Sequence, residues 1–229
     1  MSAEINPSFR DILSEFYSKL GIPSDIPEDV EVLNPYTSKK TCVLIEQFFN
    51  KYYSDQKGRI LLIGINPGRF GGGLTGIGFT DPINLEDKCD IENDLEKKNE
   101  LSSIFMYAMI EEYGGPRKFF SKYLFTSVSP LGFIRDGKNV NYYDIPGLKN
   151  SLEKFMVESL VQQINLGGSR ELAYSIGMGE NIKYLKYLNK KYQLFKQINA
   201  LPHPRWIMQY RRKKMREFVK TYVKTLNSH

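Results

Sequence analysis

The chain has 229 residues, and its 41% hydrophobic and 13% aromatic content is typical of a globular protein with a full core, which excludes a disordered chain. Its two cysteines and two histidines exclude a disulfide framework, a four-cysteine iron–sulfur cluster and a multi-histidine metal site. No apolar run approaches the roughly 18 residues of a membrane span, and the polar N-terminus does not resemble a signal peptide, so we expect a cytoplasmic protein without a membrane partner.

The net charge of +6 is concentrated near the C-terminus. Residues 205–229 contain eight lysines and arginines but only one acidic residue, Glu217, so the rest of the chain is close to neutral. A concentrated basic segment favours binding to a polyanion, with nucleic acid as the first candidate. Charge alone is nevertheless explained as well by a solvated, lysine-rich helix.

Helices and strands are predicted to alternate along the chain, from amphipathic spacing and from buried apolar runs respectively. The predicted helices cover residues 8–20, 38–54, 97–113, 145–166, 180–190 and 206–226, and the predicted strands cover residues 59–65, 123–128, 171–176 and 193–199. We interpret residues 21–36 as an extended connector and residues 135–141 as a polar loop. The alternation predicts an α/β fold with three layers, α/β/α, around a central four-stranded parallel sheet.

We expect the whole chain, 1–229, to form a single domain. Its α/β core is predicted to cover residues 59–226. Residues 1–56 are then an N-terminal helical extension packed on that core.

The strand at 59–65 runs into an unusual loop. Six glycines lie between positions 64 and 76, together with Pro67, and we predict neither helix nor regular strand there. Asn66 stands where the strand becomes the loop, and Phe79 follows the glycines. The other predicted strands also end in unusual loops, at 127–133, 177–179 and 201–206. Because the carboxyl ends of parallel strands meet at one edge of a sheet, we expect these loops to line one cleft.

These loops together resemble the motifs of the uracil-DNA glycosylase superfamily, and they are most similar to those of its single-strand-selective monofunctional branch. In chain order the matching segments read GINPG at 64–68, TGIGF at 75–79, PL at 130–131, GMG at 177–179 and LPHP at 201–204. The ordered matches span about residues 60–206. The resemblance implies a uracil-DNA glycosylase-like fold and a DNA repair enzyme that acts without a metal or another cofactor.

The resemblance also implies roles for the motif residues. Asn66 would orient a water molecule through its amide, which cannot act as a strong base, and His203 would donate a hydrogen bond to the base as it leaves with negative charge. Phe79 would stack on the base. Ile65 and Gly68 would contact it through their backbone. The target base must leave the duplex stack to reach such a site.

The chain departs from the family at the base-reading position after the second strand, where asparagine is usual and Ser127 stands here. A carboxamide offers an acceptor and two donors to adjacent groups of uracil, and a single hydroxyl cannot match that. The sequence therefore leaves the identity of the excised base open.

The C-terminal segment would bind the DNA. We expect a monomer whose DNA contacts are made by Arg205, Trp206, Arg211, Arg212, Lys213 and Arg216. Trp206 or Ile207 would fill the gap that the extruded base leaves. The motif loops contain no lysine, so imine formation and strand cleavage are not expected.

Two alternatives remain. A DNA-binding module of the same fold without catalysis would bind oligonucleotides with steep salt dependence and release no base. A nucleotide-binding protein ranks last, because the chain lacks both the phosphate-loop motif that ends in Gly-Lys-Ser/Thr and the dinucleotide-binding glycine motif that leads directly into a helix.

Overall fold

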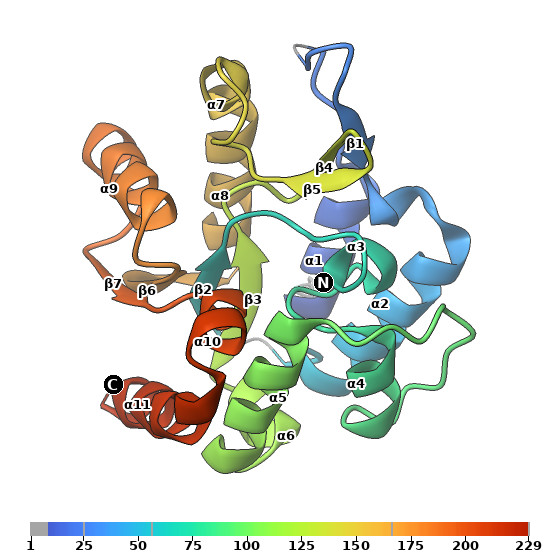
Figure 1. The fold of residues 1–229 in the computed structure, drawn as a ribbon, viewed down its shortest axis with the longest axis vertical. Coiled ribbons are helices and arrows are strands. Elements are labelled where there is room, and N and C mark those ends of the chain that lie inside the picture. Colours follow the sequence, from blue (N-terminus) through green and yellow to red (C-terminus); the bar gives the residue numbers. More distant parts are fainter. Residues whose placement is uncertain (1–8, 25, 56, 166, 229) are drawn as a thin grey trace, which may run out of the picture.

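The computed structural model describes residues 9–24, 26–55, 57–165 and 167–228. Within them, a central sheet is flanked by helices on both faces, and a smaller sheet lies to one side (Figure 1). The predicted start of the first helix, at residue 8, lies outside the described part of the chain. No helix among the described residues is long and apolar enough to cross a membrane.

The described helices are α1 (Phe9–Ser18), α2 (Lys39–Tyr52), α3 (Gly72–Thr75), α4 (Pro82–Asp87), α5 (Leu101–Tyr113), α6 (Pro116–Phe120), α7 (Leu148–Ser151), α8 (Glu153–Asn165), α9 (Glu180–Tyr192), α10 (Pro204–Tyr210) and α11 (Met215–Asn227), with 3-10 turns η1 (Pro35–Thr37) and η2 (Arg212–Lys214). The strands are β1 (Glu31–Leu33), β2 (Arg59–Gly64), β3 (Tyr123–Ser127), β4 (Gly132–Arg135), β5 (Lys138–Val140), β6 (Gly168–Ile176) and β7 (Gln197–Leu201).

The central sheet has the order β3-β2-β6-β7, and every neighbouring pair is parallel. Leu61, Leu62 and Ile63 of β2 are fully buried, because helices cover both faces of the sheet. On one side α5, α10 and α11 pack together, with Phe105 of α5 and Tyr222 of α11 edge to face at 5.0 Å between ring centres. The predicted three-layer fold with a four-stranded parallel sheet is confirmed.

The smaller sheet was not predicted. Its order is β1-β4-β5 with antiparallel pairing, so the connector at 21–36 contains a strand and the loop at 135–141 overlaps a hairpin. These strands have only three or four residues, which is too short for an alternating pattern to be read. Asp136 and Gly137, with φ of 50° and 67°, form the turn between β4 and β5.

The glycine loop is more ordered than predicted, because residues 72–75 form one helical turn, α3. Its glycines allow close packing. A Cβ atom at Gly73 would lie only 2.6 Å from the carbonyl oxygen of Gly68, and one at Gly76, where φ is 70°, would overlap Ile45 of α2. The loop is thereby held against the N-terminal part of the chain.

Two predicted helices are broken and the last strand is shifted. The predicted helix at 206–226 is interrupted at Arg211 and divides into α10 and α11, and the one at 145–166 divides at Leu152 into α7 and α8. The strand predicted at 193–199 is found at 197–201, because Gln193 ends α9 in the left-handed conformation.

Candidate active site

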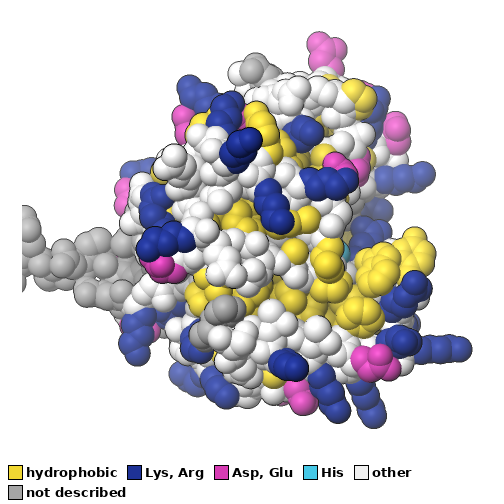
Figure 2. Space-filling view, turned by 90° about the vertical axis from the view of Figure 1, so that its left-hand side faces the viewer, with side chains coloured by type: hydrophobic (Ala, Val, Ile, Leu, Met, Phe, Trp, Pro, Cys, Tyr) yellow, Lys and Arg dark blue, Asp and Glu magenta, His cyan; other side chains and the backbone are white. Residues whose placement is uncertain are grey.

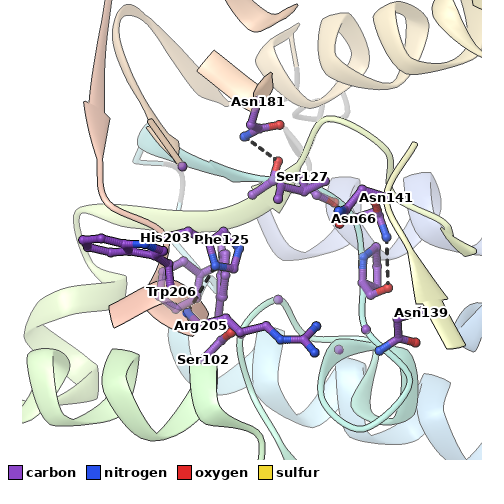
Figure 3. A pocket seen from close by; sticks show the side chains of 18 of the residues that line it. Asn66, Ser102, Phe125, Ser127, Asn139, Asn141, Asn181, His203, Arg205 and Trp206 are labelled. Atoms are coloured by element: carbon purple, nitrogen blue, oxygen red, sulfur yellow. Dashed lines mark hydrogen bonds between the residues drawn. The ribbon is translucent and has the colours of Figure 1, made fainter. Parts of the chain in front are cut away.

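A cavity of about 630 Å³ opens at the carboxyl edge of the central sheet (Figure 3). Its walls come from all four strand ends: residues 64–68 after β2, 125–127 of β3, 177–181 after β6, and four of the residues 202–206 after β7. The convergence expected from the topology is therefore present. The six residues for which catalytic or base-binding roles were predicted all line this cavity: Asn66, His203, Ile65, Gly68, Phe79 and Ser127.

The side-chain amide of Asn66 is held in one orientation. Its Nδ2 donates to the carbonyl oxygen of Val140 at 3.3 Å and to that of Pro67 at 3.4 Å, and its Oδ1 accepts from the backbone N–H of Tyr142 at 3.2 Å. A carbonyl oxygen can accept two hydrogen bonds, so Oδ1 retains a lone pair for a water molecule in the half-open cavity. Val140 ends β5, within residues 135–141 that were predicted to form a polar loop, and Tyr142 directly follows that predicted loop.

His203 is the N-cap of α10, and its Nδ1 accepts a hydrogen bond from the backbone N–H of Arg205 at 3.2 Å. In the neutral ring the hydrogen must then be on Nε2, which is a donor. Burial, together with the nearby Arg205 guanidinium, lowers the pKa of His203 from 6.5 to about 4. At neutral pH His203 is thus an uncharged hydrogen-bond donor facing the cavity.

Phe79 forms a flat apolar wall beside this histidine. Its ring lies edge to face on Phe125 at 5.3 Å, and 6.3 Å from the His203 ring, measured between centres. The φ of Phe79 is 54°, a conformation uncommon for a bulky residue. A Cβ atom at Gly64 would lie 2.8 Å from the end of the Phe79 ring, so the glycine allows the ring to rest on the backbone where β2 ends.

Polar contacts at the ends of β3 and β6 involve Ser127 and Asn181. The Ser127 hydroxyl donates to the carbonyl oxygen of Ser129 at 2.6 Å, which leaves Oγ free to accept. Asn181 is buried, and its Nδ2 donates to the carbonyl oxygen of Gly64 at 3.2 Å, while its Oδ1 accepts from the Tyr142 hydroxyl at 3.0 Å. Asn181 therefore joins the end of β2 to the segment that orients Asn66.

Glu100, just before α5, adds a titratable carboxyl group to the wall. Burial and the negative charge of Asp81 raise its pKa to about 7, against the opposing effects of Ser102 and Arg205. Part of the Glu100 population is therefore neutral at physiological pH.

Sequence reasoning missed several residues of the wall, among them Tyr17, Tyr36, Glu100, Asn139, Asn141 and Asn181. Asn181 alone had a usable signal, because a polar residue in the first turn of a helix that follows a glycine-rich strand end lies near the ligand edge of such sheets.

The six residues of the C-terminal segment predicted to contact DNA divide into two groups. Arg205 and Trp206 line the cavity, whereas Arg211, Arg212, Lys213 and Arg216 are exposed outside it, at the end of α10, in η2 and in α11. On the face that carries α9 and α11, Lys and Arg side chains lie around a group of hydrophobic ones (Figure 2).

Like Tyr210, Trp206 is an exposed aromatic residue of the cavity wall. Its side chain is 41% exposed, and the Arg211 guanidinium lies 5.2 Å from its ring centre. Ile207 is fully buried, so the suggestion that it fills a gap in the DNA stack is wrong, whereas Trp206 is exposed.

No group of three or more His, Cys, Asp or Glu side chains that could hold a metal ion occurs in the described part of the chain.

Comparisons with known proteins agree with this geometry. The family model described as the uracil DNA glycosylase superfamily matches residues 51–227. The crystal structure of wild-type SMUG2 from Pedobacter heparinus is similar with a TM-score of 0.93 and 36% sequence identity, over 96% of this chain and 97% of that one. A search of curated proteins gives no match.

Proposed function

Because the chain belongs to the uracil DNA glycosylase superfamily, we propose that it hydrolyses the N-glycosidic bond of a uracil or related damaged base flipped out of DNA, without cleaving the strand. Membership of this superfamily, together with the similarity to SMUG2, identifies the protein as a DNA glycosylase. The choice of base, its extrusion and the absence of strand cleavage are the parts that we propose. The observation that carries the proposal is that Asn66 and His203 face one cavity from separate strand ends.

The reaction breaks the C1′–N bond, and the bonding electrons leave with the base, which becomes an anion, while the sugar becomes a cation at C1′. A water molecule then adds to C1′, and the proton that it loses neutralises the base anion, directly or through solvent. Because the sugar is strongly electrophilic, the water needs positioning more than activation. Asn66 suits this role, since its amide is fixed by Val140 and Tyr142 and its Oδ1 can accept from the water.

The departing base needs a hydrogen-bond donor at the oxygen on which negative charge develops. The Nε2–H group of His203 can supply it, because Nδ1 is already an acceptor for the Arg205 N–H. A donor fixed before the reaction costs no reorganisation, and losing one such donor typically lowers the rate by about 10²–10³-fold.

Other parts of the cavity would hold the base and the DNA. Phe79 offers its ring for stacking, Ile65 and Gly68 offer backbone groups, and the exposed arginines and lysines of α10, η2 and α11 can bind phosphates. Trp206 can occupy the space that the base leaves in the stack. Among the described residues no lysine lines the cavity, so the nucleophile needed for imine formation and strand cleavage is missing there.

The test is a panel of oligonucleotides, single-stranded and duplex, that carry uracil, hydroxymethyluracil, hypoxanthine, xanthine or ethenocytosine. We expect free base and an intact abasic strand from at least one of them. The strand should break only after alkali treatment. Salt-dependent DNA binding without release of any base would instead identify a non-catalytic DNA-binding module.

A further inference from the structure

The N-terminal part of the chain contributes two residues to the cavity wall. Tyr17 of α1 and Tyr36 of η1 line the same cavity as Asn66 and Ser127, although the family model begins only at residue 51. No role in the site was predicted for this N-terminal part. Its two tyrosines bring phenolic hydroxyl groups to a cavity whose base-reading position has lost a carboxamide.

The Tyr36 side chain is firmly positioned. Its ring stacks on that of Tyr17, with 4.4 Å between centres and 26° between planes, and Phe49 of α2 packs on Tyr17 at 6.0 Å. The backbone is fixed as well, since the N–H of Tyr36 donates to Asn34 at 3.0 Å and its carbonyl oxygen accepts from the Cys42 thiol at 3.1 Å.

The Tyr36 hydroxyl lies at the end of this cluster of hydroxyl groups and has the Tyr17 hydroxyl as its acceptor. The Thr126 hydroxyl donates to Gln163 at 2.5 Å, so toward Tyr17 it can only accept. Tyr17 can therefore donate to Thr126 and accept from Tyr36, which it also contacts. A phenolic hydrogen can turn about the C–O bond between its two positions in the ring plane, so Tyr36 can turn its hydrogen from Tyr17 to a ligand in the cavity.

Ser127, which directly follows Thr126, shows what the cavity lacks. Its hydroxyl hydrogen is engaged with the Ser129 carbonyl at 2.6 Å, so Ser127 can accept an N–H from a base but offers no donor. Uracil presents an N–H group next to a carbonyl oxygen. A carboxamide would satisfy both groups, whereas Ser127 leaves the carbonyl oxygen without a partner, and such a loss is costly in a buried site.

We propose that Tyr36 reads the base together with Ser127, with the phenolic hydroxyl donating to the carbonyl oxygen beside the N–H that Ser127 accepts. Tyr36 is then a specificity-determining residue supplied by the N-terminal segment, and Tyr17 positions it. This inference rests on the proposed function, because it concerns the binding of the same base.

The experiment compares Tyr36→Phe, Ser127→Asn and the double variant, using kcat/KM for uracil excision from a single-stranded oligonucleotide. Tyr36→Phe keeps the ring stack and removes only the hydroxyl, so we expect a loss of about 10–100-fold. In the Ser127→Asn background, where the carboxamide supplies a donor, the same change should cost less than about 3-fold. A purely structural role for Tyr36 would not give this rescue.

Tyr187→Phe is the matched control, because Tyr187 of α9 is also stacked on a tyrosine, Tyr184, but is exposed and lies outside the cavity. It should leave kcat/KM unchanged. Thermal melting of each variant monitors the fold. If Tyr36→Phe does not fold, Ser127→Asn alone tests the assignment of Tyr36. We expect Ser127→Asn to change kcat/KM by less than about 3-fold, because Tyr36 already donates to the carbonyl oxygen of the base. A tenfold gain would show that the wild-type site has no such donor, and it would overturn the assignment.

The outcomes separate the two proposals. Equal losses for Tyr36→Phe in both backgrounds, or no loss in either, would overturn the assignment of Tyr36 while the glycosylase activity stands. If the wild-type protein releases no base from any oligonucleotide of the panel, the proposed function and the assignment of Tyr36 both fail.

Discussion

The protonation of His203 can be tested directly by a pH titration of its ring. The hydrogen bond from the Arg205 N–H to Nδ1, together with burial, favours the neutral ring with its hydrogen on Nε2. The gap between the ordinary pKa of 6.5 and a pKa of about 4 corresponds to about 3 kcal/mol against ionisation. At pH 7 only about one ring in a thousand would then be charged.

The measurement is a long-range ¹H–¹⁵N correlation spectrum of the ¹⁵N-labelled protein between pH 4.5 and 8. The chain has only two histidines, and the other one, His229, can be removed by His229→Ala. We expect the Nε2–H tautomer with no titration above pH 5.5. A ring that titrates near pH 6.5, or that carries its hydrogen on Nδ1 at neutral pH, would refute the reasoning, because Nε2 would then not be a fixed neutral donor.

Three further predictions follow from the packing and charges of the cavity. Gly64→Ala places a Cβ 2.8 Å from the Phe79 ring and should lower the rate of excision about 10–100-fold, with a loss of about 1–3 kcal/mol in the free energy of unfolding. In the control Gly21→Ala the added Cβ meets no atom within 4 Å, so neither quantity should change, and equal behaviour of the two variants would contradict this. Glu100 has a pKa raised from 4.5 to about 7, so between these pH values the folded protein holds a proton that the unfolded chain loses, and wild type loses stability as pH rises. In urea unfolding, the free energy of unfolding of Glu100→Gln relative to that of wild type should therefore grow by up to about 3 kcal/mol from pH 4.5 to 7.5. A difference that stays constant with pH would count against this. Trp206→Ala should lower excision from duplex DNA at least about 10-fold more than excision from single strands, because only a duplex has a gap to fill when the base leaves the stack. The same loss on both substrates would show that Trp206 does not fill this gap.

The central sheet was predictable because its strands leave strong local signals. Leu61, Leu62 and Ile63 form an apolar run that only a strand covered on both faces would need, and glycine or proline marks the strand ends. The small sheet was not predictable from apolar patterns, since β5, Lys138–Val140, is short and polar. The Asp136-Gly137 pair was the available hairpin signal.

The site was predictable where a motif coincides with a strand end, as at Asn66, Phe79 and His203. Contacts between distant segments could not be read from the sequence. The backbone groups that orient Asn66 come from residues 140 and 142, and their side chains carry no signal for that role. Tyr36 likewise resembles an ordinary core tyrosine in the sequence, and only the folded chain brings it to the cavity.

The most direct test of the account is the single-turnover rate of base release, measured on an oligonucleotide from which the wild-type protein releases the base. Wild type, Asn66→Ala and His203→Ala are compared, with DNA affinity measured in parallel. We expect each variant to lose at least about 100-fold in rate while its affinity for DNA changes by less than about 3-fold. A variant that releases the base at the wild-type rate would show that the residue it lacks takes no part in the reaction, and the proposed site built from both Asn66 and His203 would be wrong.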